Sequence, residues 1–329
     1  PLQYLNLLEF YNQNKNLDKK KCVVILISHY KKSIEQIEKI GYLSSFEKII
    51  KPMVFSRNIV LNFFYTLTLY LKYKNRTPIL GNINNVWCRS YLKNKTIPYV
   101  LDDGAASINI FNSRNQNNFQ LVAKDYKPTN KFSLLIEIFL NPTKKYSFPI
   151  NFFSVYEGLK ASKDDIIKLN KYSFIQDQYI RGKEKVVVDE CWFIGSPLAD
   201  LGLIEEKKLN ELIRNISIFY LKKNIRVRYF GHRTEKSGVI DIENVKFEPN
   251  DIPFEIFYLR SKEKPLFLAS FLSSCLKNIE VMDESIELFS FYIPQEYRTE
   301  KLQKTWHKTQ LIYDYFENHT RIQVIKNYD

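Results

Sequence analysis

Apolar and polar positions along the first half of the chain alternate between two kinds of segment, strand-like and helix-like. Lys21–Ser28 is a continuous β-branched run, which is typical of a strand buried on both faces. Ser56–Lys74 carries apolar residues at helical spacing. Two short strand-then-loop segments follow at Thr77–Asn82 and Ile97–Gly104, with a helical stretch between them. Strand, helix and strand in this order predict a parallel α/β unit.

The second half of the chain repeats this pattern. Lys185–Pro197 is predicted to be a strand that ends in a Gly-Ser-Pro turn, and Glu205–Lys223 an amphipathic helix. The next strand is expected at Ile225–His232. Further short strands are predicted at Asn244–Pro249, Lys264–Ser270 and Asn278–Asp283, and a long polar helix at Glu296–His319.

The length of 329 residues predicts two domains, because a domain usually has about 100–200 residues. We place them at 1–175 and 176–329, because Tyr172–Glu184 is polar and weakly periodic. Two open α/β sheets imply a cleft between the domains, where the carboxyl ends of the strands face a ligand.

The composition is that of a globular protein with a basic surplus. Apolar residues make up 45% and charged residues 26%, which excludes a disordered, collagen-like or coiled-coil chain. Lys and Arg number 49 against 36 Asp and Glu, a net charge of +13. That surplus favours an anionic partner such as a nucleotide, an acidic glycan or an acidic lipid. Nucleic acid is not expected, since the basic residues are spread out and no aromatic RNA-binding motif accompanies them.

Cysteine spacing and hydropathy indicate a cytoplasmic protein. The four cysteines lie far apart without a Cys-x-x-Cys pair, which argues against a disulfide scaffold and a structural zinc site. The longest apolar stretch, Ile59–Leu71, is shorter than the roughly 20 residues of a membrane-spanning helix. No signal peptide is visible. The positive charge would also suit peripheral contact with the anionic inner face of a membrane.

Two adjacent carboxylates end one predicted strand. Asp102, Asp103 and Gly104 follow the strand that ends at Leu101. Mutual repulsion and partial burial would raise the pKa of one of them, which suits a general base. An ordinary solvated turn has the same residues.

A histidine ends another predicted strand. His232 closes the segment Ile225–Gly231 and is followed by Arg233. An imidazole with an adjacent guanidinium at the carboxyl end of a strand could protonate or bind a phosphate. A partly exposed loop histidine is the alternative.

Small and acidic residues at other strand ends complete the candidate set. Ser273 and Ser274 are expected to open a helix, where hydroxyls and backbone N–H groups bind phosphate or simply cap the helix. Gly195 and Ser196 form a similar pair after a strand. Glu255 could accept hydrogen bonds from ribose hydroxyls, or could be a surface carboxylate.

Several motifs are absent from the sequence. There is no Asp-x-Asp pair, no GxGxxG, no GxxxxGK[ST], no GxSxG and no HExxH. Rossmann dinucleotide binding, a P-loop, a serine-hydrolase elbow and a zinc protease are therefore not expected.

Taken in order, these segments resemble the bacterial sialyltransferases of glycosyltransferase families 52 and 38, which include lipooligosaccharide sialyltransferases and polysialyltransferases. The similarity covers most of the chain. The segments are LDDG (Leu101–Gly104), VYEGLK (Val155–Lys160), FIGSPL (Phe193–Leu198), FGHR (Phe230–Arg233), Pro253–Glu255 and SFLSS (Ser270–Ser274).

The resemblance implies a GT-B fold, with two Rossmann-like domains facing a central cleft and a C-terminal helix that crosses back. It implies an inverting enzyme that moves sialic acid from CMP-sialic acid to a hydroxyl of lipooligosaccharide or capsule, without a metal or other cofactor. The first domain would bind the acceptor and carry the general base, and the second would bind the CMP-sugar.

Roles follow from the same resemblance. Asp103 would be the general base and His232 the general acid at the departing CMP phosphate. Arg233 stands where the family has proline, which would add a second cation near that phosphate. Ser273 and Ser274 would hold the phosphate. Gly195 and Ser196 would line the nucleotide pocket, and Glu255 would bind the ribose.

Two alternatives stay open. The donor could carry another CMP-activated nonulosonic acid, such as legionaminic or pseudaminic acid, or Kdo, since the nucleotide pocket would look the same. A protein of another class, a basic glycan- or RNA-binding protein without catalysis, would also fit the charge.

Overall fold

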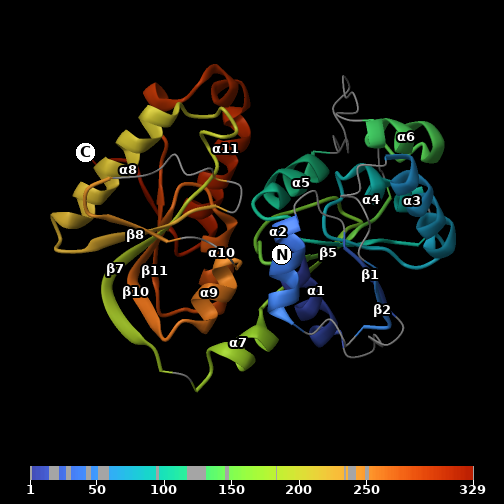
Figure 1. The fold of residues 1–329 in the computed structure, drawn as a ribbon, viewed down its shortest axis with the longest axis horizontal. Helices are drawn as coiled ribbons and strands as arrows, with labels where there is room; N and C mark the ends of the chain where they lie inside the picture. Colours follow the sequence, from blue (N-terminus) through green and yellow to red (C-terminus); the bar gives the residue numbers. More distant parts are fainter. Residues whose placement is uncertain are drawn as a thin grey trace. The chain divides into compact units, whose positions relative to one another are not determined.

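The chain forms two compact units, Pro1–Asn170 and Lys171–Asp329 (Figure 1). The computed structural model describes residues 2–14, 22–26, 31–41, 46–50, 59–93, 96–116, 131–144, 148–182, 184–232, 235, 242–248 and 252–328. The sequence places a boundary at 175/176, inside helix α7 (Ser173–Tyr179). This helix packs with the second unit, where the Gln176 side chain donates to the Val281 carbonyl at 2.7 Å.

The first unit is built on a parallel sheet. Its strands, in sheet order, are β3 (Ile79–Leu80), β4 (Tyr99–Leu101), β5 (Asn151–Ser154) and β6 (Ile166–Leu169). A separate parallel pair consists of β1 (Val23–Ile25) and β2 (Lys48–Ile50). The predicted strand 21–28 therefore contains β1, and its residues 21, 27 and 28 lie outside the described part of the chain.

Helices cover both faces of the four-stranded sheet. Successive residues of β5 point to opposite sides, as the strand period of two requires. The Phe152 ring packs on Phe111 at 4.8 Å, and the Phe153 ring packs on Phe10 at 5.4 Å. Phe10 belongs to α1 and Phe111 to α5. The helices of this unit are α1 (Leu2–Gln13), α2 (Lys31–Ile40), α3 (Ile59–Tyr73), α4 (Val86–Ser90), the 3₁₀ turn η3 (Tyr91–Lys93), α5 (Ala106–Asn115) and α6 (Lys131–Leu140).

The second unit has a six-stranded parallel sheet in the order β12-β11-β10-β7-β8-β9. The strands are β7 (Val186–Ile194), β8 (Arg226–Phe230), β9 (Val245–Glu248), β10 (Glu263–Ser270), β11 (Glu287–Phe291) and β12 (Gln323–Ile325). Successive parallel strands require crossover connections, and helices supply four of them, from β7 to β8, β9 to β10, β10 to β11 and β11 to β12. They are α8 (Glu206–Leu221), α9 (Phe254–Arg260), α10 (Ser274–Met282) and α11 (Glu300–His319).

Alternate side chains of β7 enter the two layers on either side of this sheet. Trp192 packs on α9, with its ring 5.5 Å from that of Phe257. Phe193 belongs to the core that includes the apolar stripe of α8. A strand covered on both faces is apolar at successive positions, which is why this segment was recognisable in the sequence.

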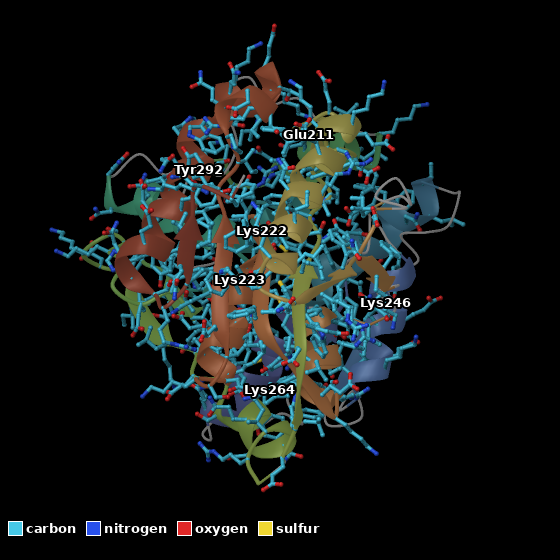
Figure 2. All side chains as sticks on the ribbon, turned by 90° about the vertical axis from the view of Figure 1, so that its left-hand side faces the viewer. Glu211, Lys222, Lys223, Lys246, Lys264 and Tyr292 are labelled. Atoms are coloured by element: carbon cyan, nitrogen blue, oxygen red, sulfur yellow. The ribbon has the colours of Figure 1, made fainter. Side chains whose placement is uncertain are left out.

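Helix α8 runs along one face of the sheet and ends near Lys222 and Lys223 (Figure 2). Other lysines labelled in that view have partners close by. Lys246 pairs with Glu248 at 2.7 Å, and the Lys264 amine donates to the Ser285 hydroxyl at 2.7 Å. The positive charge of this unit is therefore distributed over several elements.

One predicted strand is wrong. Residues 278–283 form the end of helix α10 instead. Cys275, Ile279 and Met282 are buried at positions i, i+4 and i+7, the spacing of a helix face. The helix begins after Ser273, whose side chain caps it. Ile279 and Val281 are its only β-branched residues, and they are too few to favour a strand over this capped helix. The final helix is also shorter than predicted, since residues 295–297 form the separate 3₁₀ turn η4 (Gln295–Tyr297).

The α/β class with parallel sheets in both halves is confirmed. Within the described part of the chain, we find no helix with the length and hydropathy needed to cross a membrane.

Candidate functional site

In the second unit, three neighbouring strands end at the same level. Ser270 of β10 pairs with Ile194 of β7, which in turn pairs with Phe230 of β8. Adjacent strands lie about 4.8 Å apart, so the segments that follow these ends leave the sheet at one edge. They include Gly195 and Ser196 after β7, His232 after β8, and Ser273 and Ser274 after β10. The parallel sheet therefore brings five of the predicted site residues to one edge, where open α/β sheets bind ligands.

His232 is held by an acidic residue that the sequence did not single out. Its backbone N–H donates to Glu235 Oε2 at 2.7 Å, and its carbonyl accepts from the Glu235 N–H at 2.8 Å. The other oxygen of Glu235 accepts from the Tyr229 hydroxyl at 2.7 Å. Glu235 thus closes the loop after β8 and fixes the backbone from which the imidazole projects.

Gly195 makes room for this carboxylate. A Cβ at position 195 would lie 2.5 Å from Tyr229 Oη and 2.6 Å from Glu235 Oε2. Its N–H donates to the Phe230 carbonyl at 2.8 Å, which anchors the glycine backbone to the end of β8. Burial raises the pKa of Glu235, and the hydrogen bonds from Tyr229 and His232 oppose that shift.

Ser273 caps helix α10. Its hydroxyl oxygen accepts from the Cys275 N–H at 3.2 Å, which is the ordinary capping role. A hydroxyl that accepts in this way still carries a proton that it can donate. Ser274 is the first residue of the helix and, like Ser273, is partly exposed.

Glu255 is not a surface carboxylate, since its residue is only 7% exposed. Its Oε1 accepts from the Asn278 amide at 2.9 Å, and it also bonds the Cys275 thiol. Burial, with a further contribution from Glu255, raises the pKa of that thiol. Glu255 therefore ties the first turn of α9 to the first turns of α10, beside the two serines.

In the first unit, burial gives the two carboxylates of the Asp-Asp-Gly turn different environments. Asp102 is buried, and its Oδ2 accepts from the Val155 N–H at 2.7 Å. Burial raises the pKa of Asp102 from 3.8 to about 6. The Asp102 carboxyl group, whose pKa is raised, thus joins the ends of β4 and β5. Asp103 is partly exposed. Gly104 has a φ of +65°, which explains why glycine ends this turn.

Asp103 is also held by a side chain that the sequence did not single out. The Gln3 amide donates to Asp103 Oδ1, and the Asp103 N–H donates to the Ser107 hydroxyl at 3.2 Å. Gly81, directly after β3, lets Gln3 approach, since a Cβ there would lie 2.8 Å from Gln3 Cβ and Cγ. Gln3 beside Gly81 in the first unit resembles Glu235 beside Gly195 in the second, since each polar side chain lies against a glycine that follows a strand.

No pattern in the sequence marked Gln3 or Glu235. Gln3 lies far along the sequence from Asp103, and Glu235 lies in the loop after β8. Only the folded backbone brings each of these side chains to its partner. Arg233 lies outside the described residues. Over the part of the chain that the structure describes, no group of three or more His, Cys, Asp and Glu side chains could hold a metal ion.

Comparison with known proteins identifies no close relative. No protein-family model matches the chain, and no curated protein matches its sequence. Among solved structures, the E. coli heptosyltransferase WaaC with ADP aligns with 93% of this chain and 94% of its own chain. The identity is 11% and the TM-score 0.37, which is too low to establish a common fold.

Proposed function

We propose that this protein is an inverting glycosyltransferase that moves sialic acid from CMP-sialic acid to a hydroxyl of a bacterial surface glycan. The observation that carries the proposal is the alignment of Ile194, Phe230 and Ser270 at one sheet edge. That alignment gathers the glycine, histidine and serine segments whose order resembles that of bacterial sialyltransferases.

The second unit would hold the CMP-sugar. Gly195 and Ser196 would line the nucleotide pocket, and the hydroxyls of Ser273 and Ser274 would donate to the phosphate. Helix α10 begins at these serines, so its positive N-terminal end also favours the phosphate. Fixed donors of this kind stabilise charge that develops on a leaving group. Glu255 would act on the ribose either directly or by holding α10 in place.

The first unit would supply the base. Asp103 is the partly exposed member of its pair, whereas Asp102 is occupied by the Val155 N–H. Gln3 orients the Asp103 carboxylate through its amide. A carboxylate that is oriented and still accessible suits removal of a proton from an acceptor hydroxyl.

In the proposed reaction, sialic acid passes from CMP to the acceptor hydroxyl in one displacement. Asp103 takes the proton of the acceptor hydroxyl as its oxygen bonds to the anomeric carbon of sialic acid. The bond from that carbon to the phosphate oxygen breaks, and its electron pair leaves with CMP. His232 donates a proton or a hydrogen bond to the departing phosphate. No metal or other cofactor takes part in this scheme.

The test measures CMP release and product mass with CMP-sialic acid and oligosaccharide acceptors. Asp103→Asn and His232→Ala should each lower kcat by at least about a hundredfold, the usual worth of one proton transfer. Two exposed residues give matched controls, Asp177→Asn and His307→Ala, which should keep normal turnover.

Three outcomes would decide against parts of the proposal. Near-normal turnover by either site variant refutes the role assigned to that residue. Turnover only with another CMP-activated nonulosonic acid or with Kdo keeps the mechanism and changes the donor. Absence of CMP release together with no thermal stabilisation by millimolar CMP favours a binding protein without catalysis.

A further inference from the structure

Helix α3 carries large apolar side chains on its solvent side. Val60, Leu61, Phe64 and Leu71 are each 56–59% exposed. Leu61, Phe64, Thr68 and Leu71 follow the spacing i, i+3, i+7 and i+10, so they form one stripe along the helix. Only Thr68 among them is polar, and its hydroxyl donates to the Phe64 carbonyl of the same helix at 2.9 Å. That stripe therefore presents almost no polar group that needs water.

Helix α6 continues this surface. Leu134, Ile138 and Phe139 are 47–63% exposed. The two helices lie side by side, and the rings of Phe63 and Phe139 are 5.1 Å apart (Figure 1). We call the exposed apolar side chains of α3 and α6 the α3/α6 face.

Both helices are apolar on their inner sides as well. Phe63, Leu69, Ile136 and Leu140 are buried in one hydrophobic cluster of the first unit. A helix at the surface of a water-soluble protein normally places polar and charged residues opposite its buried stripe. Contiguous exposed apolar surface of this kind marks an interaction site.

The exposed charged side chains of the two helices themselves are basic. Glu137 is the sole acid of the two helices, and it turns inward to accept from the buried Arg89 at 2.7 Å. Between Lys48 and Leu101 the sequence has nine Lys and Arg and no Asp or Glu, and one of these cations, Arg76, pairs with Glu47 at 3.7 Å. The exposed Lys72 lies in the last turn of α3, and the exposed Lys131 begins α6.

We propose that the α3/α6 face docks on the surface of an anionic lipid bilayer. The apolar side chains would enter the boundary between headgroups and acyl chains, while Lys72 and Lys131 would lie near the lipid phosphates. A second copy of the chain is a poorer occupant, because it would bring the exposed lysines of the two faces close to one another. The proposal is independent of glycosyl transfer, since lipid binding needs neither nucleotide nor acceptor.

The test is co-sedimentation of the full chain with vesicles of phosphatidylcholine alone and of phosphatidylcholine mixed with phosphatidylglycerol. The chain should bind the mixed vesicles at least about tenfold more tightly, and added salt should weaken that binding. The triple variant Leu61→Asn, Phe64→Asn, Ile138→Asn should lose about tenfold or more of the binding.

A second triple variant is the matched control. Phe148, Ile166 and Val186 are 63–68% exposed and lie outside the α3/α6 face. Their combined change to asparagine removes similar side chains and should leave vesicle binding within about twofold of the original chain. Circular dichroism of both variants checks that each is folded.

Three results would overturn the proposal. The first is absence of binding to either kind of vesicle. The second is equal loss in the α3/α6 variant and the control. The third is a dimer, seen by size-exclusion chromatography with light scattering, that the α3/α6 variant converts to monomer, because the face would then bind a second copy.

Discussion

The carboxylate of Glu235 accepts a hydrogen bond from the backbone N–H of His232 at 2.7 Å, and the backbone of Glu235 donates back to the His232 carbonyl. Two hydrogen bonds therefore join His232, the proposed general acid, to Glu235 in the loop after β8. We therefore expect Glu235 to act on the site by positioning His232.

Removal of this carboxylate should impair activity through His232. Glu235→Ala should lower kcat by about tenfold or more, because displacing a catalytic group by even 1 Å has large effects on rate. Glu235→Gln should restore most of the rate, since its carbonyl can accept from His232 while its amide donates to Tyr229. Steady-state kinetics of CMP release measures both. Equal activity of the alanine variant and the original chain would refute the positioning role.

Gly81 and Gln3 should act on activity through one contact. Gly81→Ala would place a Cβ 2.8 Å from Gln3 and push its amide away from Asp103. Gly81→Ala and Gln3→Ala should therefore each reduce kcat, and the double variant should lose no more than the worse single variant. A kinetic double-mutant cycle measures this coupling. Multiplicative losses would mean that the two residues act separately.

Asp102 should make stability depend on pH. Its pKa is raised from 3.8 to about 6 in the folded chain, so the folded state keeps a proton that the unfolded state has already lost. The stabilisation is complete below the lower value and is lost as pH rises through the upper one.

The variant Asp102→Asn isolates this effect, because its amide oxygen can still accept from the Val155 N–H. Relative to the original chain, the variant should gain about 2 kcal/mol in free energy of unfolding between pH 4 and pH 7. Urea titrations at the two pH values give the comparison. A constant difference between the two proteins would show that Asp102 does not take up a proton in this range.

The two serines at the start of α10 should differ in their effect on stability. Ser273→Ala removes the cap on the Cys275 N–H and should cost about 1 kcal/mol of folding free energy. Ser274→Ala should cost much less, since Ser274 is inside the helix. Both variants should reduce the thermal stabilisation given by CMP. If CMP raises the melting temperature of both variants as much as that of the original chain, the two serines do not bind its phosphate.

Much of the fold was predictable because strands buried on both faces and amphipathic helices leave distinct periods in the sequence. The segment around Trp192 and Phe193 is an example, since each face of β7 meets its own apolar layer. The segment 278–283 was misassigned because a short apolar run does not distinguish a strand from the end of a helix.

The order of residues along the chain was sufficient to name the strand-end groups, including Asp103, His232 and Ser273, because parallel sheets collect functional groups where strands end. Their partners were not predictable in this way. Gln3 meets Asp103 across nearly a hundred residues of sequence, and Glu235 meets Gly195 only because β7 and β8 are adjacent. The burial that raises the pKa of Asp102 is likewise a property of packing, because it depends on which neighbours exclude water from that side chain.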